Sequence, residues 1–260
     1  MVVFRVSTAA ARDARPRPSS YPIPDSGVVP TVWISASLAE TELRSYFHLL
    51  TFDEIARSRA LKQSGDRERF LTARLLLRLG LSLAVANRLH PSAWRFSAGR
   101  FGKPEMAPGL PLIHFNVSHA ARMVAVAIDP LMPIGVDVEP LDGLAAAELP
   151  SSVLSETERS ALERCDEQTR AREFVRLWTL KEAHVKRSGL GVHLDFASFA
   201  IDWQPGRDAQ IIETNDEILE TRAIPGVDTA YQVSAALGAE RRSTSWREVS
   251  IAKLARPLMQ

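Results

Sequence analysis

The stretch Trp178-Thr-Leu-Lys-Glu-Ala-His-Val-Lys186 decides the fold, because it can be laid on Phe70-Leu-Thr-Ala-Arg-Leu-Leu-Leu-Arg78. In this alignment an aromatic residue begins both stretches, a charged residue occupies the same interior position in both, and a basic residue ends both. Each stretch lies in a long segment with the apolar spacing of a helix, at 66–89 and 167–188. A short helix precedes each segment and strands follow it, which is typical of an internal repeat. We predict an α+β fold: a pseudo-dimer of two similar subdomains with the active site in the cleft between them.

Capping boxes predict the two short helices. Thr51-Phe-Asp-Glu54 and Ser155-Glu-Thr-Glu158 each place a glutamate three residues after a hydroxyl side chain. Pro91 is expected to end the first long helix, and Gly189 with Gly191 the second. Strands are predicted at 31–35, 93–97, 113–117, 123–128, 134–139, 196–203, 209–213, 229–237 and 248–251, with 123–128 and 134–139 forming a hairpin around a turn at 129–133.

These elements predict three regions. We expect an N-terminal α+β subdomain at 31–130 and a C-terminal α+β subdomain at 131–255. Residues 1–30 hold five prolines from Pro16 onward, and Arg5 interrupts the short apolar start. We expect a flexible Pro-rich tail there, with a targeting segment as the alternative.

Composition excludes several classes of protein. The 260 residues are 45% hydrophobic and 24% charged, with a net charge of +1, which favours a globular chain over disorder or a strongly basic nucleic-acid binder. Cys165 is the single cysteine, so no disulfide can form within the chain and a cytoplasmic location is expected. No apolar run approaches the roughly 20 residues that span a bilayer, so no membrane partner is expected. We expect a monomer.

Lysine is scarce in this chain, which makes its positions informative. Only five of the 32 basic residues are lysine, and Lys103, Lys181 and Lys186 fall within the motifs below. Arginine and lysine are not interchangeable at tight phosphate sites, so these positions favour a compact point charge. Chance retention is the alternative.

Gly135-Val-Asp-Val-Glu139 predicts a strand with two carboxylates on one face. Val136 and Val138 point to the core, and Asp137 and Glu139 point together to the other side. Two such carboxylates repel each other unless a cation lies between them, and hard oxygen ligands suit Mg²⁺ or Mn²⁺. The alternative is an ordinary strand whose acids are solvated.

The stretch 178–186 adds a second set of charges. On a helix Trp178, Glu182 and Lys186 share one face, with Lys181 one step around it. Glu182 is a candidate metal ligand or base, and Lys186 a candidate phosphate ligand. The alternative is a Glu–Lys pair on a solvated helix face.

A third set lies in Gly102-Lys-Pro104 and Phe115-Asn-Val-Ser-His119. The first is a stiff loop that presents Lys103, and the second places Ser118 and His119 near the end of a strand, where they can hold a phosphate. His119 as a structural histidine remains open. A Ser118–His119–Asp137 triad lacks the G-x-S-x-G elbow, and the histidines and Cys165 lack paired zinc spacing.

Taken together and in this order, the motifs resemble the Sfp-type 4′-phosphopantetheinyl transferase family. The set is G-K-P, F-N-x-S-H, G-V-D-V-E and W-x-x-K-E-x-x-x-K, with 42 positions from Glu139 to Lys181. The resemblance covers residues 31–251 and is densest from Gly102 to Gly191.

The resemblance implies a mechanism and a site. It implies transfer of the phosphopantetheine arm of coenzyme A to a serine of an acyl or peptidyl carrier protein, with release of 3′,5′-ADP and dependence on Mg²⁺. Glu182, or a metal-held water positioned by it, is the candidate base. The residues implied are Asp137, Glu139 and Glu182 for the metal, Glu182 and Lys186 for catalysis, and Arg57, Lys103, Ser118, His119, Lys181 and Lys186 for coenzyme A.

Two other functions use the same residues. A metal-dependent phosphohydrolase would need no carrier protein, and a non-enzymatic coenzyme A-binding module would not need the three acids. We expect the transferase because all three acids are present.

Overall fold

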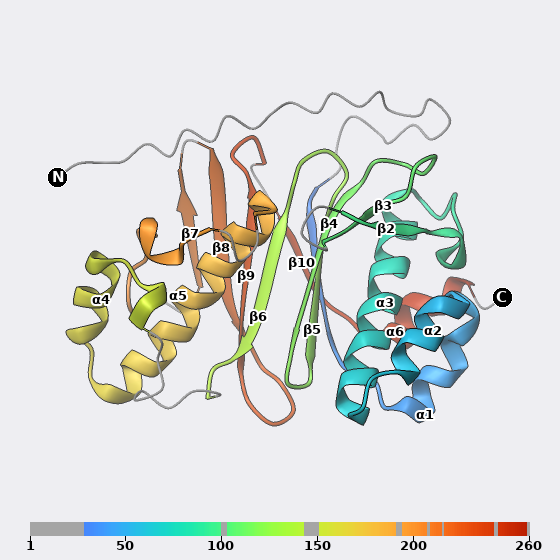
Figure 1. The fold of residues 1–260 in the computed structure, drawn as a ribbon, viewed down its shortest axis with the longest axis horizontal. Helices are drawn as coiled ribbons and strands as arrows, with labels where there is room; N and C mark the ends of the chain where they lie inside the picture. Colours follow the sequence, from blue (N-terminus) through green and yellow to red (C-terminus); the bar gives the residue numbers. More distant parts are fainter. Residues whose placement is uncertain are drawn as a thin grey trace.

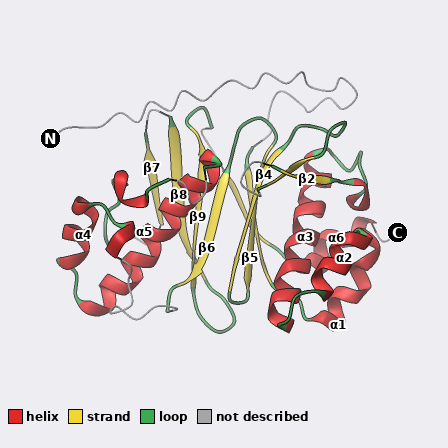
Figure 2. Ribbon diagram, viewed as in Figure 1, coloured by secondary structure: helices red, strands yellow, loops and turns green. Residues whose placement is uncertain are grey.

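Two four-stranded sheets lie face to face with helices on their outer sides (Figure 1, Figure 2). The computed structural model describes residues 29–99, 103–142, 151–190, 194–206, 209–214, 216–241 and 244–258. The order of layers is helix, sheet, sheet, helix. Each sheet therefore buries both faces, one against its own helices and the other against its neighbour.

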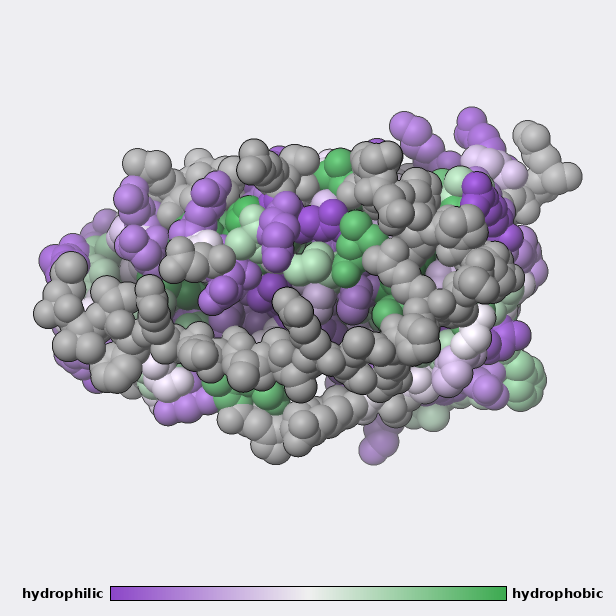
Figure 3. Space-filling view, turned by 90° about the horizontal axis from the view of Figure 1, so that it is seen from above, coloured by the Kyte–Doolittle hydropathy of each residue, from purple (hydrophilic) through white to green (hydrophobic). Residues whose placement is uncertain are grey.

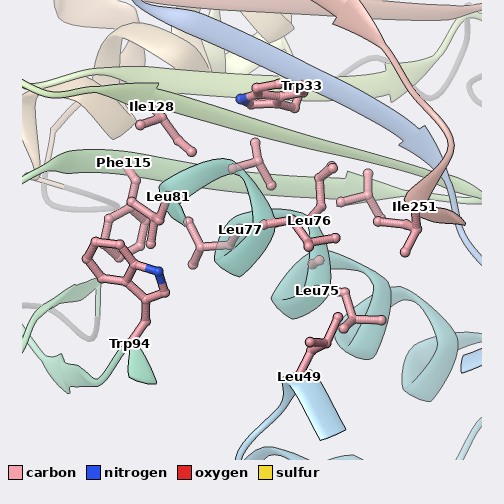
Figure 4. Packing of buried hydrophobic residues seen from close by; sticks show 14 of the residues in the cluster. Trp33, Leu49, Leu75, Leu76, Leu77, Leu81, Trp94, Phe115, Ile128 and Ile251 are labelled. Carbon is pink, nitrogen blue, oxygen red and sulfur yellow. The ribbon is translucent and has the colours of Figure 1, made fainter. Parts of the chain in front are cut away.

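The first sheet has the order β10-β1-β5-β4. Strand β5 pairs antiparallel with β1 on one side and with β4 on the other, whereas β10 pairs with β1 in parallel. Helix α3 covers this sheet, and Figure 4 shows its leucines between Trp33 and Ile128 on one side and Leu49 and Trp94 on the other. The bounds are β1 Thr31–Ala36, α1 Glu40–Leu43, α2 Phe52–Arg59, α3 Ser64–Ala84, β2 Phe96–Ala98, β3 Pro104–Met106, β4 His114–Ala120, β5 Met123–Asp129, β10 Ser245–Glu248 and α6 Ile251–Ala255.

The second sheet has the order β6-β9-β8-β7 and is antiparallel throughout. Helices α4 and α5 cover its outer face, where Phe174, Leu177 and Leu180 of α5 are buried with Leu219 and Ala236 of the sheet. The bounds are β6 Gly135–Pro140, α4 Glu156–Glu163, α5 Glu167–Ser188, β7 Ala209–Glu213, β8 Glu217–Ile224 and β9 Tyr231–Gly238.

The two sheets meet through a continuous apolar core. Val32 and Ala125 from the first sheet are fully buried with Val136, Val138 and Val233 from the second. This core fixes which face of β6 is left for polar side chains. Seen from above, the coloured part of the surface mixes hydrophilic and hydrophobic side chains (Figure 3).

The α+β class and the local helix predictions are confirmed. Both capping boxes form, with Thr51 accepting from Glu54 N–H and Ser155 from Glu158 N–H. Helix α5 has the predicted bounds, and Gly189 ends it in the left-handed conformation at φ 73°. Gly191 and Gly102 lie outside the described residues.

The predicted hairpin of 123–128 and 134–139 is wrong. Strand β5 pairs with β1 and β4, whereas β6 pairs with β9 in the other sheet. The segment 129–133 therefore carries the chain from one sheet to the next. Asp129 fixes this crossing, because its carboxylate accepts from Leu131 N–H at 2.8 Å, from Met132 N–H and from the Arg241 guanidinium.

Other boundaries also differ. Helix α3 ends at Ala84 rather than 89, because Ala86 and Asn87 adopt positive φ angles of 53° and 59°. The predicted strand at 196–203 holds a 3₁₀ turn at Phe196–Ser198 instead, and β8 was not predicted. A helix, α6, begins at Ile251, where the last strand was expected.

The C-terminal segment returns to the first sheet. Ser245 to Glu248 pair with Thr31 to Ile34, and Ile251 and Ala255 are buried in the first core. The predicted boundary at 131–255 therefore needs this amendment. Residues 1–28 of the predicted tail lie outside the described residues. In the portion that is described, no helix is both long and apolar enough to cross a bilayer.

Candidate active site

Strands β4 and β6 lie next to each other although they belong to different sheets. The side chain of Asn116 in β4 accepts a hydrogen bond from Val136 N–H in β6 at 2.9 Å. This contact takes the place of a backbone ladder. Two residues further along β4, Ser118 Oγ donates to Asp137 Oδ1 at 2.7 Å. The site therefore begins where the two sheets touch.

Strand alternation sends the acids of β6 toward α5, as predicted. Val136 and Val138 are fully buried in the core between the sheets, so Asp137 and Glu139 face the other side. Gly135 lets α5 come close, because a Cβ there would lie 2.0 Å from the Ala183 carbonyl oxygen. The missing side chain thus brings helix and strand backbones together.

Helix α5 turns its predicted face to these acids. Lys186 Nζ lies 2.5 Å from Asp137 Oδ1, 3.1 Å from Ser118 Oγ and 3.9 Å from Glu182 Oε2. Trp178, two turns earlier, acts as a donor toward the Glu139 carboxylate and lowers its pKa. The structure therefore brings Asp137, Glu139, Glu182, Ser118 and Lys186 into one cluster.

The cluster carries more negative than positive charge. Burial, followed by the charges of Asp137 and Glu182, raises the pKa of Glu139 to about 7, against the opposing effect of Lys186. Burial also raises the pKa of Glu182, with Asp137 adding to the shift and Lys186 opposing it. One ammonium does not neutralise three carboxylates, so a further cation would relieve their repulsion.

The residues fit a hard divalent cation. Asp137 Oδ2 is buried and has no hydrogen-bond partner in the described part of the chain, and a buried carboxylate oxygen in that position needs a cation or a donor. Across the same residues no three His, Cys, Asp or Glu side chains already form a set able to hold a metal. The Lys186 ammonium contacts both Asp137 and Glu182 in this structure.

Lys103 and His119 lie at the border of the cluster. Lys103 Nζ donates to the Lys186 carbonyl oxygen at 2.6 Å, and burial lowers the pKa of this lysine to about 8. His119 has an exposed side chain, and partial desolvation, with Arg69 and Lys186 as nearby cations, lowers its pKa. Both residues come from the first half of the chain.

Lys181 does not join the cluster, and its predicted role in coenzyme A binding stays a prediction. Its side chain is fully buried, and its ammonium donates to Glu158 Oε2 at 2.5 Å and to the Phe199 carbonyl oxygen at 2.9 Å. One step around a helix is about 100°, which is enough to turn Lys181 away from Glu182. Lys181 holds α5 to α4.

Arg57 also lies apart from the acids. Its guanidinium lies over the Phe70 ring at 5.7 Å, on the same ring that Arg74 contacts at 5.3 Å. No described contact joins Arg57 to the cluster of Asp137. Its predicted contact with a remote phosphate stays a prediction.

Sequence reasoning missed two residues that shape the site. Asn116 and Trp178 were part of the quoted motifs but received no role. Asn116 joins β4 to β6, and Trp178 on α5 lowers the pKa of Glu139. An asparagine inside an apolar strand is a signal for such a side-chain contact, because a buried amide needs partners.

Comparison with known proteins places this chain in a family. Residues 133–235 match the family model described as "4'-phosphopantetheinyl transferase superfamily". The chain is 31% identical over 170 residues to 4'-phosphopantetheinyl transferase Sfp of Bacillus subtilis (strain 168), covering 65% of this chain and 74% of that one. The chain belongs to the Sfp-type 4′-phosphopantetheinyl transferase family.

Two further relatives extend the match. A 4'-phosphopantetheinyl transferase of Bacillus subtilis is 33% identical, covering 52% of this chain and 58% of that one. A putative 4'-phosphopantetheinyl transferase of Synechocystis is 30% identical, covering 63% and 66%. The family model includes Asp137, Glu139, Glu182 and Lys186 within its span, so the acidic cluster lies inside the matched region.

Proposed function

We propose that this protein transfers the phosphopantetheine arm of coenzyme A to a serine of an acyl or peptidyl carrier protein, releasing 3′,5′-ADP, in a reaction that depends on Mg²⁺. The observation that carries the proposal is the acidic cluster of β6 and α5, with a buried and unpartnered Asp137 Oδ2 among the described residues, in a chain of this family. Mn²⁺ suits the same oxygen ligands.

The proposed roles follow from position and charge. Asp137, Glu139 and Glu182 would hold the metal ion, which when bound supplies charge neutralisation at the pyrophosphate. Lys186 lies beside these acids and would contact the phosphates. Lys103, His119 and Arg57 supply cations or donors from the first half and would hold the more remote phosphate.

The chemistry needs a proton acceptor. The carrier serine oxygen forms a bond to the β-phosphorus of coenzyme A, the bond from that phosphorus to the bridging oxygen breaks, and 3′,5′-ADP leaves. Glu182 accepts the serine proton, either directly or through a water that it positions.

The site would lie in a cleft between two similar subdomains of a monomer. Each half contributes a short helix, a long helix and a four-stranded sheet, and the amended second subdomain excludes β10 and α6. Residues of β4 and Lys103 come from the first half, and those of β6 and α5 from the second.

The test is the intact mass of an apo carrier protein after incubation with the enzyme, coenzyme A and Mg²⁺. We expect a gain of one phosphopantetheine and an equal amount of 3′,5′-ADP. The isosteric Asp137→Asn variant should abolish transfer, whereas Asp202→Asn, at an exposed position, should leave it unchanged. Release of 3′,5′-ADP without a carrier protein would instead show a phosphohydrolase.

Steady-state kinetics then separate the two lysines. Lys103→Ala should weaken coenzyme A affinity by about tenfold to a hundredfold, which is the range of a single charge-assisted contact, with a smaller effect on the maximal rate. Lys186→Ala should lower the maximal rate itself, because Lys186 lies beside the acids. The reverse pattern would contradict this division of roles.

A further inference from the structure

The Ser118 hydroxyl has no hydrogen left for a phosphate. Ser118 is buried in β4, and Oγ donates its single hydrogen to Asp137 Oδ1 at 2.7 Å. The same oxygen accepts a hydrogen bond from Lys186 Nζ at 3.1 Å. A serine that contacts a phosphate has to donate to it, because phosphate oxygens are acceptors. Ser118 would have to break the bond to Asp137 first.

The same contacts fix how Asp137 is turned. Asp137 Oδ1 accepts from Ser118 and from Lys186, and the side chain is almost fully buried. Oδ2 has no partner within the described residues. Rotation of the carboxylate would remove two donors from Oδ1, so the two oxygens cannot exchange freely. Oδ2 is therefore the oxygen that remains available to a cation.

Ser118 is held in place independently of Asp137. Asn116, two residues earlier on the same strand, binds the Val136 backbone of β6, and β4 is anchored to β5 along its length. The hydroxyl thus approaches Asp137 from a rigid strand of the other sheet. Lys186, by contrast, reaches Asp137 on a long flexible side chain.

We propose that Ser118 is a positioning residue of the metal site: its hydroxyl orients the Asp137 carboxylate so that Oδ2 is presented to the divalent cation. This revises the expectation that Ser118 binds coenzyme A, and it rests on the proposed metal-dependent function. Partners that orient a ligand typically change metal affinity by about 10- to 100-fold when removed.

Two binding measurements on the full chain test the proposal. Mn²⁺ is titrated into protein saturated with coenzyme A, without carrier protein, and followed by electron paramagnetic resonance. Coenzyme A affinity is measured separately in EDTA by calorimetry. Ser118→Ala should raise the Mn²⁺ dissociation constant about tenfold and change the coenzyme A dissociation constant less than about twofold. Ser118→Thr keeps the hydroxyl and should restore most of the Mn²⁺ affinity. His119→Ala should give the opposite pattern to Ser118→Ala.

The outcomes separate this proposal from the proposed function. Weaker coenzyme A binding with unchanged Mn²⁺ affinity in Ser118→Ala would make Ser118 a phosphate ligand and overturn the proposal. If the alanine variant does not fold, Ser118→Cys replaces it in both measurements. Cysteine has a side chain of similar size, but its thiol is a weaker hydrogen-bond donor than the serine hydroxyl. If neither folds, the hydroxyl is needed for the fold and the proposal also fails. Wild-type protein that modifies the carrier but binds no Mn²⁺ would overturn the metal site itself.

Discussion

Glu54 and Glu158 perform the same two tasks in the two halves of the molecule. Each closes the capping box of a short helix, accepting from Thr51 N–H at 3.0 Å or Ser155 N–H at 2.8 Å. Each also accepts from a buried cation on the following long helix, Arg78 Nε at 2.9 Å or Lys181 Nζ at 2.5 Å. The halves therefore use one device to join a short helix to a long one.

The halves differ in the charged side chains that their long helices place next to the neighbouring strands. Helix α5 places Glu182 and Lys186 beside the acids of β6. Helix α3 carries Arg69, which donates to the Ala121 carbonyl oxygen at 2.8 Å, and Arg74 over the Phe70 ring. The comparison shows that similar scaffolds carry different charges: carboxylates with a single lysine in one half and arginines in the other.

The largest expected effect comes from removing the glutamate that caps the short helix and pairs with the buried cation of the long helix. Glu54→Ala and Glu158→Ala each leave a buried cation without its carboxylate, which costs about 3–5 kcal/mol. The stability of these two variants should depend on pH in different ways. Burial lowers the pKa of Lys181, so the Glu158→Ala protein regains stability as the pH rises toward the unfolded pKa of lysine, about 10.4, and Lys181 becomes neutral. The Glu54→Ala protein should show no such recovery, because arginine side chains stay charged in proteins.

Urea denaturation between pH 6 and pH 10 measures this difference. Glu156→Ala is the control, because Glu156 lies on the same helix as Glu158 with 82% of its side chain exposed and should change stability by less than about 0.5 kcal/mol. Equal pH dependence in Glu54→Ala and Glu158→Ala would contradict the interpretation that the nature of the cation separates the halves.

Two glycines test how closely each long helix approaches its sheet. A Cβ at Gly135 would lie 2.0 Å from the Ala183 carbonyl oxygen, whereas one at Gly80 would lie 2.7 Å from the Ile128 side chain. A side chain can move, but the backbone of α5 cannot without separating Lys186 from Asp137. We expect Gly135→Ala to cost about 3 kcal/mol. Gly80→Ala should stay within about 1 kcal/mol of wild type, because helix propensity offsets part of its strain.

Thermal denaturation of both variants measures these costs. Gly65→Ala is the control in α3, where the new Cβ would lie 3.3 Å from an arginine side-chain nitrogen at the nearest. Stability should stay the same or rise there. A Gly135→Ala protein as stable as Gly80→Ala would mean that α5 can move away from β6 at little cost.

The acids of the second half should make stability depend on pH. The folded pKa of Glu139, about 7, lies above the roughly 4.3 of an unfolded glutamate, so ionisation destabilises the fold as the pH rises between these values. Glu139→Gln should therefore leave stability unchanged near pH 4 and raise it by about 1–2 kcal/mol at pH 8, after allowance for partial exposure.

Mg²⁺ sharpens this prediction. At pH 8 the ion should raise the melting temperature of wild type more than that of Glu139→Gln, because the variant lacks one carboxylate charge. Glu248→Gln, an exposed position in β10 of the first sheet, is the control and should show no pH-dependent gain. A gain from Glu139→Gln that is equal at pH 4 and pH 8 would contradict charge repulsion as its cause.

Short-range sequence patterns correctly predicted the helices and strand faces that depend on contacts between residues close together in the chain. The capping boxes and the bounds of α5 depend on residues within four positions of each other, and all were confirmed. The shared face of Asp137 and Glu139 follows from strand alternation alone. The cluster of Asp137, Glu182 and Lys186 was accessible because four motifs in order resemble one family.

Long-range contacts decided what the sequence left open. Strand β6 pairs with β9, whose residues lie almost a hundred positions later, and no local signal distinguishes this from a hairpin with β5. Strand β8 was not predicted, and its Glu220 is buried and bonded to Trp246 Nε1 at 2.6 Å. The turn of Lys181 toward Glu158 likewise depends on a partner 23 residues away.

The smallest effect concerns the hairpin between β4 and β5, next to His119. Ala121 has a φ of 46°, a left-handed conformation that costs an L-residue about 1–2 kcal/mol, and glycine adopts it without that cost. The greater chain entropy of glycine offsets part of the gain, so Ala121→Gly should stabilise the protein by about 0.5 kcal/mol. Ala120→Gly, on the extended strand beside it, should destabilise by a similar amount because it gains only flexibility. Urea titrations of the two variants measure the difference. Glycine keeps the carbonyl that Arg69 binds, so a loss of stability in Ala121→Gly would mean that the chain entropy of glycine outweighs the relief of the strained backbone.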